Sequence, residues 1–339
     1  MPRCLLLTAA LLLMALAIVP RDVLAVEDCP HYEPVLLVEG ADIYKPGSSG
    51  ADKKGEEENS ERLAPVINFM KYEAKAVDEP SDKSALKCSL ATLTQWAEAG
   101  ALLEPPDTPG RVARVWISSG MGFILAKYKA LGVPLPVSLV RWYANLAATV
   151  RNDYHEPLKK AGYKGLFANT YPWAAVSSAL SALIGQDAAA YQFQDEAWLN
   201  MLAEVQPDGS LIGEMTRGQR ALIYHLKAAD GLVILNNVRE ALGEKEKSQQ
   251  IGALKRLLAF SGNGLCDPTP FAKRAGELQE KVGEYEFRGL LAFGRSVLPE
   301  SFGKCGPQPK TYFWPEYTGG DARQAHKAVW AVVGKGSYP

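Results

Sequence analysis

A succession of amphipathic helical segments constrains the fold of this chain more than any other feature. From about residue 63 onward, apolar residues recur with the period of about 3.6 that an α-helix requires. Gly and Pro residues separate several of these segments, and the alternation typical of strands is scarce. The chain is therefore predicted to be all-α, with helices joined as hairpins, although the pattern alone leaves a ring, a bundle and a solenoid open. Helices are expected over 63–75, 84–101, 110–130, 137–151, 172–185, 189–205, 214–242, 247–260, 270–281 and 285–295.

Two segments of different composition flank this helical region. Residues 45–62 are mostly Gly, Ser and charged residues, which predicts a flexible loop or an exposed lid. The last 40 or so residues are rich in Gly, Pro and aromatic residues and are expected to form a packed tail. We therefore divide the exported chain into an extension with a lid at 26–62 and one helical domain at 63–339.

The N-terminus has the pattern of a secretory signal peptide. Arg3 is followed by an apolar, uncharged run over 4–19, and small residues at Val23 and Ala25 suit cleavage after Ala25. The alternative is an uncleaved anchor, but the run is shorter than the roughly 20 residues of a spanning helix. We expect residues 1–25 to be removed, which leaves a periplasmic or secreted protein that has no contact with the membrane.

Cysteine usage agrees with an oxidising compartment. Of the five cysteines, Cys4 lies in the signal segment, and Cys29, Cys88, Cys266 and Cys305 remain. Four cysteines allow three pairings. We favour Cys29 with Cys88 and Cys266 with Cys305, because each bond then joins neighbouring segments. No Cys-x-x-Cys pair and no spaced histidine pair predicts a metal site.

The formal net charge of −1 excludes the global basic field that nucleic-acid binders carry. A polyanionic ligand would have to be held by local cations. Such cations occur in the segment 208–228, which reads DGSLIGEMTRGQRALIYHLKA. With about 100° per residue, Arg217, Arg220 and Tyr224 fall within about 60° of one another. The face of Leu222 and Leu226 is opposite, so two guanidiniums and a phenol are predicted to share one polar face.

This segment resembles the family-5 polysaccharide lyases, the alginate lyases, in their pattern of Glu, then Arg-x-x-Arg-Ala-Leu-x-Tyr-His. CSLATLTQWAEAGAL at 88–102 and FANTYPWAAVSSALSA at 167–182 are similar to two further family segments, and PLKK at 157–160 and YFWPEY at 312–317 follow the same order. The resemblance covers 85–240 well and the rest loosely. It implies an (α/α) toroid of antiparallel helical hairpins around a deep cleft, a monomer without cofactor, and an acidic polysaccharide as partner.

The resemblance also implies a chemistry, the β-elimination of uronate chains. The C5 proton is removed, the C4–O bond breaks, and the sugar carboxylate needs neutralisation while this happens. Arg217 matches the family arginine that neutralises the carboxylate, Asn169 matches the asparagine that helps to hold it, and Tyr224 matches the catalytic tyrosine. The residues expected to bind substrate are Arg220, Thr170, Tyr171, Trp173, His225, Trp314, Tyr317 and Lys45.

The sequence departs from the family pattern at the general base and in the lid. Thr170 stands where the family has a histidine, and a threonine hydroxyl cannot act as a base near neutral pH. The family places a lysine before a tyrosine in the lid, whereas here Ile43 precedes Tyr44 and Lys45 follows it. We rank Tyr224 first and Tyr171 second as the group that takes the proton.

Three functions fit the sequence to different degrees. The first is a lyase acting on alginate or a related polyuronate, which the joint presence of Asn169, Arg217 and Tyr224 favours. The second is a degenerate periplasmic protein that binds polyuronate without cutting it, which Thr170 favours. The third is a hydrolase of the same fold, which requires a pair of carboxylates across the glycosidic bond. No such pair is recognisable among Asp153, Glu156, Glu214 and Glu316.

Overall fold

The computed structural model describes residues 29–44, 50, 52–160, 169–245, 248–294 and 297–334, with the side chains of 155–160 excepted. Within these ranges the all-α prediction is confirmed: the structure has no strand, and the β-bridges are isolated ones. The expected signal peptide at 1–25 lies outside the described residues. None of the described helices is long and apolar enough to cross a membrane.

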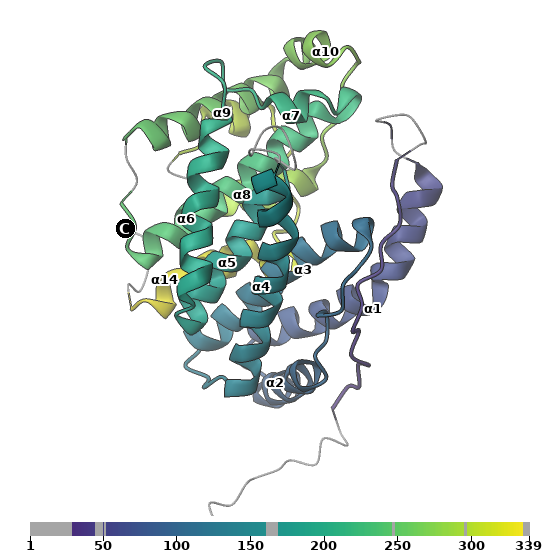
Figure 1. Cartoon of the computed structure of the whole chain (residues 1–339), viewed down its shortest axis with the longest axis vertical. Coiled ribbons are helices and arrows are strands. Elements are labelled where there is room, and N and C mark those ends of the chain that lie inside the picture. Colours follow the sequence, from purple (N-terminus) through teal and green to yellow (C-terminus); the bar gives the residue numbers. More distant parts are fainter. Residues whose placement is uncertain are drawn as a thin grey trace, which may run out of the picture.

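The helices follow one another along the whole chain (Figure 1). The first six, which carry most of the core, are α1 (Lys53–Asp78), α2 (Lys83–Glu98), α3 (Thr108–Ala130), α4 (Val137–Lys160), α5 (Tyr171–Gly185) and α6 (Ala188–Ala203). Next come α7 (Ile212–Met215), the 3₁₀ turn η2 (Gly218–Arg220), α8 (Ala221–Leu242), α9 (Ser248–Cys266) and α10 (Thr269–Ala275). The last are the 3₁₀ turn η3 (Glu284–Phe287), α11 (Arg288–Phe293), α12 (Glu300–Cys305), α13 (Pro315–Thr318) and α14 (Ala322–Val332).

Helix α5 forms the centre of the core. All of its residues from Tyr171 to Ile184 are buried, and it packs against α3, α4, α6 and α8. The chain returns at its end to its beginning, because α13 and α14 pack on α3 and α13 also contacts α1. Helical hairpins that close in this way agree with the toroid expectation.

Local signals explain why four of the described helices start where they do. Asp82, Asp107 and Asp187 cap α2, α3 and α6, and their carboxylates accept backbone N–H groups from the first turns at 2.7–3.0 Å. Such a cap is typically worth about 1 kcal/mol. Asp321 caps α14 in the same way. The C-terminal tail is packed as expected, but it contains helices that the sequence interpretation missed.

The prediction of a loop over 45–62 was wrong for 53–62, which form the first turns of α1. This stretch is charged, but its charges are spaced as a helix needs them. Arg62 pairs with Glu58, and Lys53 lies 3.8 Å from Glu57, both at i,i+4 spacing. Gly55 is buried against the backbone of Asp42, where a Cβ would collide with the carbonyl oxygen.

The single helix expected over 214–242 was also wrong, because the chain forms α7, η2 and α8 instead. Gly218 adopts the left-handed region with a φ of +54°, which interrupts the helix directly after Arg217. Arg217 and Arg220 therefore precede α8, and only Tyr224 lies on it.

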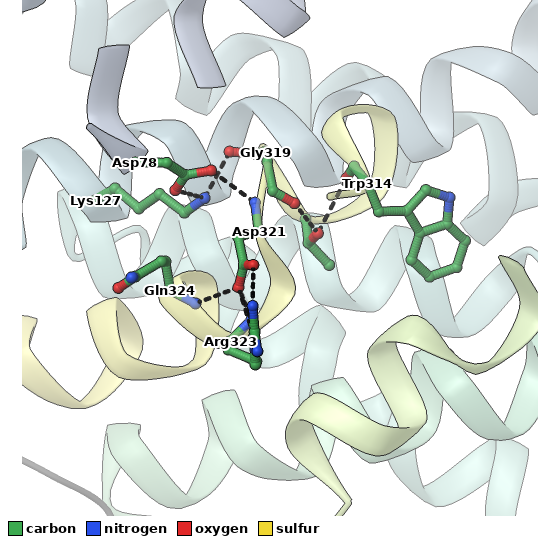
Figure 2. A network of polar contacts seen from close by, with 9 residues as sticks. Asp78, Lys127, Trp314, Gly319, Asp321, Arg323 and Gln324 are labelled. Carbon is green, nitrogen blue, oxygen red and sulfur yellow. Dashed lines mark hydrogen bonds and ion pairs between the residues drawn. The ribbon is translucent and has the colours of Figure 1, made fainter. Parts of the chain in front are cut away.

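A buried polar network joins α1, α3 and the loop after α13 (Figure 2). The Lys127 ammonium, 3% exposed, donates to Asp78 Oδ1 and to the Gly319 carbonyl, each at 2.7 Å. Asp321 N donates to the second Asp78 oxygen at 2.7 Å. The network fixes the C-terminal aromatic segment against the first and third helices.

Both favoured disulfide pairings are confirmed. Cys29 is bonded to Cys88 at the start of the described chain, and Cys266 is bonded to Cys305 between α9 and α12. The first bond attaches the extended segment 29–44 to α2, and this segment then runs beside α1 (Figure 1).

Candidate active site

A pocket of about 370 Å³ lies where the N-terminal extended segment meets α1, α3, the two residues before α5 and the first turn of α8. Its lining combines polar groups with apolar and aromatic side chains, as ligand sites usually do. Four of the residues singled out from the sequence meet here: Asn169, Thr170, Arg217 and Tyr224. The remaining lining residues are Ala41, Asp42, Ile43, Tyr44, Asn59, Thr108, Pro109, Val112, Ala113 and Trp116.

Glu214 holds two of these polar groups together. Asn169 Nδ2 lies 3.2 Å and 3.3 Å from the two Glu214 carboxylate oxygens, and Arg217 Nε lies 3.6 Å from one of them. The Glu214 side chain is 1% exposed, and burial raises its pKa, while the charge of Arg217 and the amide of Asn169 oppose this rise. Because Glu214 engages the Nε edge, the other edge of the guanidinium remains for a ligand.

The ring of Tyr224 lies directly beside the guanidinium of Arg217. The Arg217 Cζ atom is 4.9 Å from the centroid of the Tyr224 ring, a cation–π contact. Tyr224 comes from the first turn of α8, and Arg217 comes from the turn before η2, so the break at Gly218 brings them together. A guanidinium fork next to a phenol can neutralise a carboxylate while a proton is transferred near it.

The two residues at the start of α5 differ in their access to the pocket. Thr170 lines it, and its hydroxyl is hydrogen-bonded to Tyr154. Tyr171 is 2% exposed, does not line the pocket, and packs edge-on against Phe193 of α6. The structure thus places Tyr171 outside the lining of this pocket, and its expected roles in substrate binding and as second-ranked base stay predictions.

Arg220 is directed toward the N-terminal side of the pocket. Its Nε donates to Glu280 and its Nη2 donates to Glu56, each at 2.9 Å. Its Cζ atom also lies 5.7 Å from the centroid of the Tyr44 ring. Burial raises the pKa of Tyr44, while the charges of Arg217 and Arg220 oppose this rise. Arg220 thus holds α1 and Tyr44 in place and is not among the lining residues.

His225 is buried and does not line the pocket, and its expected contact with substrate stays a prediction. Its ring is 0% exposed: Nε2 accepts from Leu211 N at 2.9 Å, and Nδ1 lies 2.8 Å from the Ala221 carbonyl oxygen. Burial lowers the pKa of His225 to about 4. The neutral ring therefore ties the residue that precedes α7 to the first turn of α8.

The expected aromatic contacts also lie deeper than predicted. Trp173 is 0% exposed and meets Tyr317 edge-on at 4.8 Å, and Trp314 is stacked on Tyr317 at 3.9 Å. None of the three lines the pocket. Tyr317 instead stacks at 5.2 Å on the ring of Trp116, a residue that does line the pocket. The cluster supports Trp116 from behind.

Sequence reasoning missed Glu214, Tyr44 and Trp116 as parts of the site. The i,i+3 spacing of Glu214 and Arg217 was a usable signal for the first. The sequence gives no such signal for Trp116, because an aromatic residue at an apolar position of a helix is expected to be part of the core. Lys45, expected to bind substrate, lies outside the described residues.

Comparisons with known proteins agree with one another. Residues 119–271 match the family model described as Alginate lyase. A polysaccharide lyase of Stenotrophomonas maltophilia is 27% identical over 281 residues, which cover 80% of this chain and 81% of that protein. An alginate lyase of Azotobacter vinelandii is 26% identical over 260 residues, which cover 73% and 67%.

Solved structures share the fold. Alginate lyase A1-III in complex with a tetrasaccharide matches with a TM-score of 0.70 at 18% identity, covering 87% of this chain and 84% of that one. The structure of the same enzyme from Sphingomonas species A1 matches with a TM-score of 0.65 at 18% identity, with the same coverage of both chains. The fold of the present chain is therefore that of an (α/α) toroid.

Proposed function

Since the chain belongs to the alginate lyase family, we propose that it is a polysaccharide lyase that cleaves alginate or a related polyuronate by β-elimination. One observation carries the assignment of the site: Asn169, Arg217 and Tyr224, which come from three separate segments, line a single pocket. Binding of a polyanion alone requires cations but no phenol beside them.

Arg217 and Asn169 act on the substrate carboxylate. Removal of the C5 proton adds negative charge next to this group, so the charge must be neutralised in the transition state. The fork of Arg217 suits a carboxylate, and its position is set by Glu214, which also holds Asn169. Glu214 is thus a positioning residue, because it acts on the substrate through its two neighbours.

Tyr224 performs both proton transfers in this mechanism. Its phenolate oxygen takes the C5 proton, the electron pair of the C5–H bond forms the C4=C5 double bond, and the C4–O bond breaks. The same phenol then gives its proton to the leaving oxygen, so the enzyme returns to its starting state. Thr170 takes no part as a base, and Tyr171 is buried away from the pocket.

The test is the ultraviolet absorbance of unsaturated uronate ends. Purified mature protein is offered polymannuronate, polyguluronate, acetylated alginate and other polyuronates. We expect absorbance to rise with at least one polymer and the rise to be lost in Tyr224→Phe. If absorbance rises with no polymer while a titration still shows binding, the assignment as a lyase is overturned. The protein would then bind the polysaccharide without cleaving it.

We further propose that the protein is exported to the periplasm and loses residues 1–25. The two disulfides support an oxidising compartment. N-terminal sequencing of protein from a periplasmic extract tests this, and a mature chain that begins at Met1 would contradict it.

A further inference from the structure

Lys227 occupies a position behind the site that the mechanism above does not use. It lies one turn after Tyr224 on α8 and is partly buried. Its Nζ atom is 5.5 Å from the centroid of the Tyr224 ring and 5.7 Å from the centroid of the Trp116 ring. Both residues line the pocket. The Lys227 ammonium is therefore placed against the two aromatic walls of the candidate active site.

The charged groups around Lys227 come from several elements, and none of them is bound to it. Across the described part of the chain, no hydrogen bond or ion pair is formed by its ammonium. Burial lowers the pKa of Lys227, and the charge of Glu286 on η3 raises it most. The other charges that act on it are those of Arg220, Glu214 and Glu56.

Asp230, on the same helix, does not neutralise this cation. Its carboxyl group is 1% exposed, neither of its oxygens has a partner among the described residues, and burial raises its pKa well above the usual range. Burial therefore disfavours the charged form of this carboxyl group. Two aromatic ring faces, in turn, favour the charged form of an amine between them.

The Tyr224 ring thus has two cations against it, and they are not equivalent. Arg217, at 4.9 Å, is already 3.6 Å from the carboxylate of Glu214 and is also the group that would meet the substrate carboxylate. Its charge is offset by both carboxylates when substrate is bound. Among the described residues, no carboxylate is in contact with Lys227. When Tyr224 loses its proton, the negative charge spreads over the oxygen and the ring, and Lys227 is a cation at the ring whose charge no described carboxylate offsets by contact.

We propose that Lys227 is a positioning residue that stabilises the phenolate form of Tyr224, so that this tyrosine can serve as the base in a site where Thr170 cannot. The inference rests on the proposed role of Tyr224. It deepens that role by identifying the charge that makes a phenol usable as a base.

The direct test is a pH titration of Tyr224 by nuclear magnetic resonance, in protein labelled with ¹³C at the tyrosine ring ζ-carbon. Tyr224→Phe identifies the resonance. In Lys227→Met, which keeps the apolar stem, we expect the ionisation midpoint of Tyr224 to rise by about one pH unit, the effect of losing one nearby opposite charge. Lys129→Met is the matched control, since Lys129 is also partly buried but donates to the Ile184 carbonyl, away from the pocket. An unchanged midpoint in Lys227→Met would overturn the proposal.

Kinetics give a second readout. The acidic limb of the kcat/KM profile should move to higher pH by the same amount in Lys227→Met and return toward the wild-type position in Lys227→Arg. A structural role alone would lower kcat at every pH and leave the limb in place, which would also overturn the proposal. The resonance titration needs no turnover. If the wild-type protein cleaves no polymer, the lyase fails while the titration still decides the role of Lys227.

Discussion

The guanidinium of Arg217 has to serve two carboxylates at once, and this can be tested by replacing it with lysine. Its Nε edge faces Glu214 at 3.6 Å, and the side chain is 38% exposed, so the opposite edge is open to the pocket. A single ammonium cannot reproduce two separate edges. In Arg217→Lys, either the contact with Glu214 or the contact with the substrate carboxylate is lost.

The size of the effect follows from this geometry. A hydrogen bond to a charged group is worth about 1.5–3 kcal/mol, and each 1.36 kcal/mol is a factor of ten in rate. The loss of one such bond in the transition state predicts a fall in kcat/KM of roughly 10- to 150-fold. The fold should be unaffected, because the positive charge that pairs with buried Glu214 is retained.

The assay is the initial rate of formation of unsaturated ends over a range of polymer concentrations. Arg274→Lys is the matched control: Arg274 is 40% exposed and pairs with Asp208, but it lies on α10 away from the pocket. Thermal unfolding of both variants checks that they are folded. A loss of less than about threefold in Arg217→Lys would refute the idea that both edges of the guanidinium are used.

Two predictions concern stability. The pKa of His225 is lowered to about 4 from an ordinary value of 6.5, so the folded chain binds this proton less well than the unfolded chain. The stability that neutral His225 provides is present above pH 6.5 and should fall by about 3 kcal/mol as the pH drops to 4, whereas His225→Gln should lack this part of the loss in urea denaturation. Lys127→Met leaves Asp78 as a buried, unpaired charge and should cost about 3–5 kcal/mol of unfolding free energy by the same method. Adding Asp78→Asn should recover part of that cost, and a single variant as stable as wild type would contradict the burial of this pair.

Much of the helical framework could be predicted because its signals are local. The expected bounds of the helices over 84–101, 110–130 and 172–185 differ from α2, α3 and α5 by no more than a few residues, since Asp caps and Gly or Pro breakers mark them. The start of α1 and the break at Gly218 were missed. The start of α1 was missed because a charged stretch has the same composition in a flexible lid and in an exposed helix. The break was missed because the backbone conformation of Gly218 depends on the residues that pack around it.

For the candidate site, the sequence predicted which residue types take part but not how they are arranged in space. Arg217 and Tyr224 do meet, but the shared helix face that predicted this does not exist. The sequence pattern placed Arg220 on the same helix face as Arg217 and Tyr224. In the structure, Arg220 instead binds two carboxylates that are 60 and 164 residues away along the chain. Trp173 shows the same limit: nothing local distinguishes an indole that contacts a ligand from one that is fully enclosed.

The disulfide between Cys29 and Cys88 has a consequence for when the enzyme becomes complete. It anchors the segment whose far end, Asp42 to Tyr44, forms one wall of the pocket. Closing a loop of 59 residues by such a bond is worth about 4 kcal/mol, a large share of the 5–15 kcal/mol that typically stabilises a folded protein. A newly made chain in a reducing compartment lacks this anchor. The pocket is therefore completed only after Cys29 and Cys88 are oxidised, which is a later step than synthesis of the polypeptide. It is completed in the compartment where this oxidation takes place.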